Sequence, residues 1–124
     1  MWLYHATYKA NINSIKKWGL GAIQNKNWNI SIKNNICLSP NPEEANSFCE
    51  CAEDVLDDIY NSGIIVLAIN TTNLKKELLK QDPNILSTKS FIYPEIIPSN
   101  VLYVITNEKI IGKLNSLKTV PLFY

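Results

Sequence analysis

The sequence predicts a single α+β domain made of short strands and short helices, and three observations support this. The apolar segment Met1–Thr7 and the longer apolar run Ile64–Ile69 are both typical of strands buried in a sheet. Between them, Pro40–Ala45 has the composition of a helix start. A chain of 124 residues is also long enough to bury a core without disulfides or metals. We therefore expect one domain covering residues 1–124.

The first helix is expected to follow the opening strand directly. Asn11 is placed to cap it, because an asparagine side chain can accept a hydrogen bond from a free amide of the first turn. Ile12, Ile15 and Trp18 share one helical face and are expected to pack inward. Gly19 is expected to end the helix as a left-handed C′ residue.

The next part of the chain contains a long polar segment and a second helix. Gly21–Asn35 is rich in Asn and Lys and is expected to be a loop, of a length more typical of a binding lid than of an ordinary connection. A strand is expected at Asn35–Ser39. The helix after it begins with Asn41 as N-cap and Pro42 in the first position. We interpret the acidic stretch Glu50–Asp58 as a solvated surface, not as a metal site.

The C-terminal half is expected to alternate between strands and helices. Strands are predicted at Ser90–Tyr93 and Val101–Thr106. A helix is predicted at Asn73–Lys80, and the apolar spacing after Asn107 predicts another. An edge strand is expected at Val120–Tyr124.

The charged residues and cysteines limit the class of protein. The net charge is +1, and all 12 basic residues are lysine, so the chain has no overall field to attract nucleic acid or an acidic membrane. Three cysteines without a C-x-x-C pair are typical of free thiols in a cytoplasmic protein. Neither a signal peptide nor a membrane span is expected. Frequent Asn, Ile and Lys suggest an AT-rich genome, as in a low-GC bacterium or its phage.

His5 is the only histidine and lies at the end of the first predicted strand. A neutral imidazole both donates and accepts hydrogen bonds, which suits a sugar hydroxyl. The same side chain could instead close the strand end by bonding to a carbonyl group. The sequence leaves both roles open.

Several motifs occur in an order that resembles the ADP-ribosyltransferase superfamily. They are Leu3–Thr7, Ser14-Ile15, Gly19-Leu20, Ile36–Ser39 with Ala45 and Phe48, and Ile92–Pro98. The nearest layout is the histidine-tyrosine-glutamate branch, which includes diphtheria-like toxins, poly(ADP-ribose) polymerases and bacterial DNA-modifying toxins. The resemblance extends from Leu3 to about Val104. It implies a split, strongly bent pair of small sheets with NAD bound in the cleft between them.

The first motif is the best preserved. Leu3–Thr7 reads LYHAT and looks like the family's LYHGT, with Ala6 in place of glycine. The resemblance implies that His5 hydrogen-bonds a ribose hydroxyl of NAD and that the backbone of Ala6 holds the nicotinamide amide. Thr7 completes this predicted cofactor-binding segment.

The second motif departs from the family pattern. The family tyrosine corresponds to Cys37, which directly precedes Leu38 and Ser39. A thiol fills space but cannot stack on nicotinamide as a phenol ring does. Cys37 and Ser39 remain predicted cofactor contacts. Phe48 matches a second aromatic of the family, and it either lines the nicotinamide or packs in the core.

The third motif departs further. Alignment on Ile97-Pro98 places the family's catalytic glutamate at Ser90. Serine can bond to a ribose hydroxyl but supplies no negative charge for the positively charged transition state. The nearest carboxylate is Glu95, which either substitutes for the glutamate or is an exposed turn residue. Ser90 and Glu95 are therefore the predicted catalytic residues.

The sequence supports three hypotheses about function. The first is an ADP-ribosyltransferase-like protein that binds NAD, as substrate, or a related nucleotide, and that transfers ADP-ribose to a protein or nucleic-acid acceptor if it is active. The second is a catalytically degenerate, toxin-like or phage counter-defence protein that inhibits a partner through Glu43–Asp58 or Lys26–Lys33. The third makes Cys37 a nucleophile beside His5. No metal is expected in any of them.

Overall fold

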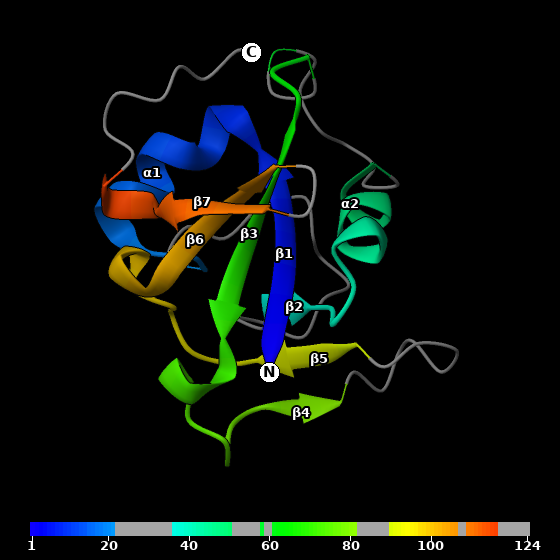
Figure 1. Cartoon of the computed structure of the whole chain (residues 1–124), viewed down its shortest axis with the longest axis vertical. Coiled ribbons are helices and arrows are strands. Elements are labelled where there is room, and N and C mark those ends of the chain that lie inside the picture. The colour runs from blue at the N-terminus through cyan, green and yellow to red at the C-terminus, as the bar shows by residue number, and fades with distance from the viewer. Residues whose placement is uncertain (22–35, 51–57, 59–60, 82–89, 107–108, 117–124) are drawn as a thin grey trace.

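Two small antiparallel sheets and a few short helices make up the fold, which confirms the predicted α+β class (Figure 1). The computed structural model describes residues 1–21, 36–50, 58, 61–81, 90–106 and 109–116. In this part of the chain, no helix is long and apolar enough to cross a membrane.

The larger sheet has four strands in the order β1-β3-β6-β7. These strands are β1 (Trp2–Tyr8), β3 (Ile64–Asn70), β6 (Leu102–Thr106) and β7 (Lys109–Lys113). β3 lies between β1 and β6, and its Leu67, Ala68 and Ile69 are buried. This interior position explains why β3 reads as a continuous apolar run. The two predicted strands that form the β1–β3 pair, Met1–Thr7 and Ile64–Ile69, are confirmed.

The smaller sheet has the order β2-β5-β4. Its strands are β2 (Ile36–Leu38), β5 (Phe91–Tyr93) and β4 (Lys80–Gln81). In Figure 1 these strands run across the direction of β1 and β3 at the lower end of the larger sheet, with β4 the lowest of them. Both predicted strands in this sheet, at Asn35–Ser39 and Ser90–Tyr93, are confirmed.

The two sheets meet where β1 passes the end of β2. The amide of Tyr4 donates to the carbonyl oxygen of Ser39 at 2.7 Å, and the amide of Ser39 donates back to Tyr4 at 2.9 Å. This pair of main-chain bonds places His5, the next residue of β1, beside β2.

A second bridge fixes the segment that follows α1 (Ile12–Trp18). Leu20 and Ile97 exchange main-chain hydrogen bonds of 2.8 and 3.0 Å. Gly19 ends α1 as predicted and has a positive φ of 92°, but its ψ of 165° lies outside the left-handed helical region, so the predicted left-handed conformation is wrong. Residues other than glycine rarely adopt this conformation. A Cβ atom there would lie 2.7 Å from Cγ2 of Ile96 and 2.9 Å from the carbonyl oxygen of Ile97.

The second α-helix, α2 (Pro42–Glu50), packs against β1 and β3, and α1 lies on the other side of the larger sheet in the view of Figure 1. The predicted N-cap is confirmed, because Oδ1 of Asn41 accepts from the amide of Glu43 at 2.8 Å. The buried hydroxyl of Tyr8 donates to the carbonyl oxygen of Cys49 at 2.9 Å and ties the last turn of α2 to β1. Four 3₁₀ turns complete the described helices: η1 (Lys9–Asn11), η2 (Thr71–Asn73), η3 (Ser99–Val101) and η4 (Leu114–Ser116).

The hydrophobic core draws on both sheets and on α1. Its buried members are Leu3, Ile12, Ile15, Leu20, Ile36, Leu38, Leu67, Ile69, Leu74, Tyr93, Ile97, Leu102, Val104 and Leu114. Because residues of both sheets share this core, their mutual arrangement is set by packing as well as by the main-chain bonds between them.

Two details predicted for α1 are wrong. Asn11 makes no side-chain cap, because it ends the η1 turn in helical backbone conformation and its Nδ2 donates to Oγ1 of Thr7 at 3.3 Å. Trp18 is 57% exposed and does not pack inward with Ile12 and Ile15. Its ring instead lies under the ammonium group of Lys17, whose Nζ is 4.8 Å from the ring centroid.

The helix predicted at Asn73–Lys80 is wrong. Only the 3₁₀ turn η2 forms at its start, where Oδ1 of Asn70 accepts from the amide of Thr72 at 3.1 Å. The end of the segment enters β4, because Lys80 and Gln81 pair with Ile92 and Phe91. Pairing with a neighbouring strand has therefore overridden the helical spacing of the leucines.

The helix predicted after Asn107 is also wrong. Residues 109–113 form β7, which pairs with β6 with a register shift between Val104 and Ile105. Ile110 and Ile111 are both substantially exposed on this strand, so their apolar spacing does not report a buried helical face. The expected strand at Val120–Tyr124, the loop beyond Gly21 and the acidic stretch between Glu50 and Asp58 lie outside the described residues.

Candidate functional site

His5 is fixed by a hydrogen bond to the backbone of the other sheet. Its Nδ1 atom lies 2.8 Å from the carbonyl oxygen of Cys37 on β2. A carbonyl oxygen only accepts, so Nδ1 must carry the proton and Nε2 is left as the acceptor of a neutral ring. Burial lowers the pKa of His5, and the smaller effect of the bond to Cys37 opposes this shift. Near neutral pH the site therefore presents an uncharged imidazole.

This contact bears on both roles left open for His5. The expected position of His5 at a strand end is wrong, because β1 continues to Tyr8 and His5 pairs with Leu67 inside it. Bonding to a carbonyl group is still what a purely structural histidine would do. The same bond also fixes the tautomer and the ring orientation, so that Nε2 has a defined direction for accepting a hydroxyl proton. The geometry fits a sugar-binding role and does not require one.

The two residues that follow His5 differ in their surroundings. Ala6 pairs with Val66 inside β1, so its backbone is extended and needs no glycine. Thr7 is buried, and its hydroxyl accepts from Asn11 at the start of α1. The Thr7 side chain is therefore used inside the fold.

Ser39 and Ser90 lie together at one end of the smaller sheet. Each is 1% exposed. The register pairs Leu38 with Phe91, so Ser39 and Ser90 are the next opposing residues beyond that pair. Oγ of Ser39 accepts from the amide of Asn41 at 3.1 Å, which links the strand end to the start of α2.

Ser90 is also bonded to an acid that the sequence analysis missed. Its hydroxyl donates to Oε1 of Glu44 at 3.0 Å. From the sequence, Glu44 is placed only in the helix start Pro40–Ala45 and in the acidic region Glu43–Asp58 of the inhibitor hypothesis, and it is not a predicted site residue. One signal could have found it, because Glu44 and Phe48 are four residues apart and so share a face of α2.

Cys37 and Phe48 occupy different environments. Ile36 and Leu38 are buried, so the alternating strand turns the Cys37 side chain the other way and leaves it exposed. His5 contacts the carbonyl oxygen of Cys37 and not its sulfur in this hydrogen bond, which gives no support to the nucleophile hypothesis. Phe48 is half-buried on α2. This exposure fits either role predicted for it.

Glu95 is not brought to Ser90. The two residues lie beyond opposite ends of β5, and five extended residues span up to about 16 Å. Glu95 is exposed and forms an ion pair with Lys75, whose Nζ lies 3.1 Å from Oε2. This placement matches the exposed turn residue that the sequence left as the alternative for Glu95.

The polar groups of the candidate site converge on β2. The His5 contact is at Cys37 and the Ser90–Glu44 contact is at the level of Ser39, two residues or about 7 Å along the strand. We define the candidate site as His5, Cys37, Ser39, Glu44 and Ser90. It combines a neutral acceptor, two buried hydroxyls and one carboxylate.

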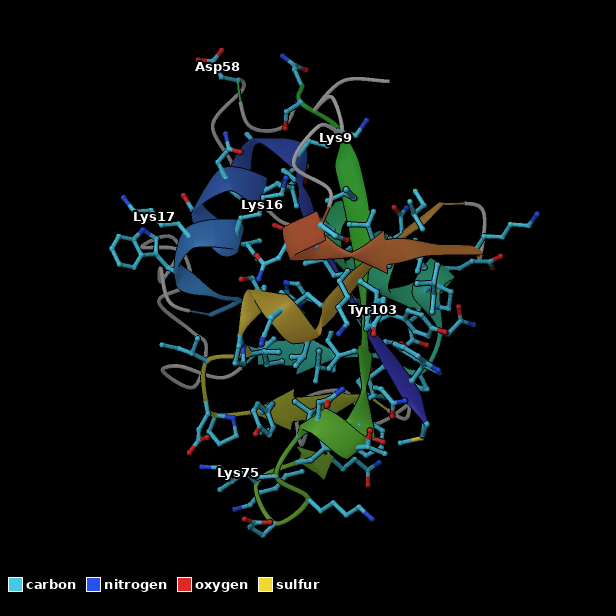
Figure 2. All side chains as sticks on the ribbon, turned by 60° about the vertical axis from the view of Figure 1, so that its left-hand side comes forward. Lys9, Lys16, Lys17, Asp58, Lys75 and Tyr103 are labelled. Carbon is cyan, nitrogen blue, oxygen red and sulfur yellow. The ribbon has the colours of Figure 1, made fainter. Side chains whose placement is uncertain are left out.

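Lysines, metal-ligand groups and cysteines also bear on what the chain can bind. Figure 2 shows Lys17 and Lys75 pointing outward at separate parts of the molecule. Among the described residues, no group of three or more His, Cys, Asp or Glu could hold a metal ion. Both described cysteines, Cys37 and Cys49, carry thiols outside any disulfide.

Comparison with known proteins gives no match. This holds for protein-family models, for curated proteins and for solved structures. The functional argument therefore depends on the residues of this chain.

Proposed function

We propose that this chain is an ADP-ribosyltransferase-like protein that binds NAD, as substrate, or an ADP-ribose-type nucleotide. The observation that carries the proposal is the neutral His5, whose Nδ1 is fixed on Cys37 and whose Nε2 can accept from a ribose hydroxyl. The meeting of two small sheets at Tyr4 and Ser39 supports the split, bent architecture of that superfamily.

The remaining residues are assigned by the same resemblance. The backbone of Ala6 would hold the nicotinamide amide, and Phe48 would pack against its ring from α2. Cys37 and Ser39 would contact the nucleotide from β2. In the active form, ADP-ribose would pass to a protein or nucleic-acid acceptor in the cytoplasm, as in bacterial toxin-like enzymes.

Calorimetric titration of the purified chain with NAD tests the proposal. The wild type should bind, and His5→Ala should weaken binding at least about tenfold, as expected for the loss of one hydrogen bond of about 1.4 kcal/mol. Asn13→Ala, on the exposed face of α1, is the matched control and should leave binding unchanged. Absence of binding at millimolar NAD would contradict the proposal. Labelled NAD incubated with a cell lysate then separates an enzyme from a binder.

A second candidate function is supported by the two departures from the family motifs. Cys37 has an exposed thiol where the family has an aromatic ring, and Ser90 is an uncharged residue where the family has an acid. A fold kept as a scaffold for inhibiting a partner needs neither group. In a pull-down, a complex that tolerates His5→Ala but is lost in Asp58→Lys would favour this function over nucleotide binding.

A further inference from the structure

Glu44 places a carboxylate at the position where the third motif lacks one. Its Oε1 accepts a hydrogen bond from the hydroxyl of Ser90. Ser90 is the residue that aligns with the catalytic glutamate of the ADP-ribosyltransferase superfamily, which this chain resembles. We propose that Glu44, reaching in from α2, is the catalytic carboxylate of this chain. This inference rests on the proposed binding of NAD.

The chemistry requires a negative charge at this place. Cleavage of NAD breaks the bond between C1′ of the ribose and N1 of nicotinamide, and both electrons of that bond leave with nicotinamide, which becomes neutral. Positive charge then builds up on the ribose ring, as in the oxocarbenium-like transition states that carboxylates stabilise in glycoside hydrolysis. Water or an acceptor hydroxyl adds at C1′ and releases its proton, so that water gives ADP-ribose, nicotinamide and one proton. The hydroxyl of Ser90 alone cannot stabilise the positive charge.

The local structure holds Glu44 in one position. The side chain of Asn41 accepts from the amides of Glu43 and Glu44 at 2.8 and 3.4 Å, which fixes the first turn of α2. Ser39 accepts from the amide of Asn41 at 3.1 Å and anchors this turn to β2. Ser90 then fixes the carboxylate through Oε1, so Oε2 is the oxygen that can face a ribose hydroxyl or the developing charge.

The position of Glu44 relative to His5 supports the same assignment. His5 contacts β2 at Cys37, and Ser90, which holds Glu44, lies directly before β5 at the level of Ser39. The two positions on β2 are about 7 Å apart along the strand, and β5 lies about 5 Å from β2 across the sheet. Both contacts therefore involve the same strand, β2, and our proposal places one ribose between the two groups. Glu44 is half-buried and Glu43 is exposed, so the two adjacent acids differ in surroundings while sharing one helix turn.

The test measures NAD affinity and nicotinamide release on the same variants. Glu44→Gln keeps an oxygen that can accept from Ser90 and removes only the charge, so the fold and the NAD affinity should be kept within about threefold. Nicotinamide release should fall by about 10²–10³-fold, the usual effect of losing one electrostatic contact to a transition state. Glu44→Asp should retain part of the rate. Glu43→Gln is the matched control and should release nicotinamide at the wild-type rate.

The outcomes separate this inference from the proposed function. If Glu44→Gln keeps the wild-type rate while His5→Ala loses NAD binding, the role of Glu44 is overturned and the proposed function stands. If the wild type binds NAD but releases no nicotinamide, the catalytic role is likewise overturned and binding stands. If Glu43→Gln and Glu44→Gln lose the rate equally, the assignment to Glu44 is overturned. If the wild type neither binds nor cleaves NAD, both are overturned.

Discussion

The Nδ1 atom of His5 donates to the carbonyl oxygen of Cys37 at 2.8 Å, so a side chain of β1 is held by the backbone of β2. This bond crosses from the larger sheet to the smaller one beside the Tyr4–Ser39 pair. The protonation of the His5 imidazole therefore depends on how the two sheets meet.

The free energy of unfolding should depend on pH through His5. Burial lowers the pKa of His5 below its ordinary value of 6.5, so the unfolded chain binds more protons than the folded chain once the pH falls below about 6.5. Stability from the neutral ring is thus complete above pH 6.5 and is lost as the pH falls through the folded-state pKa. Urea unfolding between pH 7.5 and 5 should show this loss. His5 is the only histidine, so in His5→Asn the same pH range should give a flatter profile.

Gly19→Ala should destabilise the protein much more than Gly63→Ala. Both glycines have a positive φ, 92° and 88°, so each substitution costs about 1–3 kcal/mol of backbone strain. A Cβ at Gly19 would also come within 2.9 Å of the carbonyl oxygen of Ile97, whereas a Cβ at Gly63 would meet only the Lys9 side chain, at 3.8 Å. Thermal unfolding of the two variants measures the difference. Equal losses would show that the close approach of Gly19 to the Ile97 backbone relaxes without cost.

Asn41→Ala should lower the free energy of unfolding by about 0.5–2 kcal/mol, because the amides at the start of α2 lose their side-chain acceptor. Denaturant unfolding gives the value. Asn41→Asp keeps an acceptor oxygen and should stay close to the wild type. Asn13→Ala replaces an exposed asparagine inside α1 and should be neutral or slightly stabilising. A loss of the same size in Asn13→Ala would mean that the cap of α2 is not the cause.

The elements predicted correctly are those whose own residues strongly favour one secondary structure. β3 is a continuous apolar run, and α2 starts with an asparagine cap followed by proline. The wrong predictions concern segments whose apolar residues have helical spacing but whose backbone pairs with a neighbouring strand. Residues 109–113 have apolar positions that suit a helix, but the neighbouring β6 offers backbone partners, and they form the edge strand β7. Pairing of this kind depends on segments far apart in the chain, so periodicity within one segment does not reveal it.

The residues of the candidate site could be predicted when they lie within one sequence motif, and not when they depend on contacts between distant segments. His5 was found because it is the only histidine and lies in an apolar segment that predicts a strand, although β1 continues three residues beyond it to Tyr8. Glu44 was not found, because its contact with Ser90 joins residues 46 positions apart and arises from the register of β2 against β5. Glu95 was considered because it is close to Ser90 in the sequence, yet β5 separates them in space.

The junction of Tyr4 with Ser39 has a consequence for how substitutions elsewhere would act. Two main-chain bonds between crossing strands constrain the tilt of one sheet on the other less than a long ladder would. The tilt is therefore set largely by the volumes of the fully buried side chains on either side, such as Leu3 and Leu38. A change of one methylene in either leucine would therefore alter how β1 meets β2, where His5 contacts Cys37, while leaving the pairing within each sheet in place. The position of His5 against β2 is therefore determined partly by the packing of the hydrophobic core.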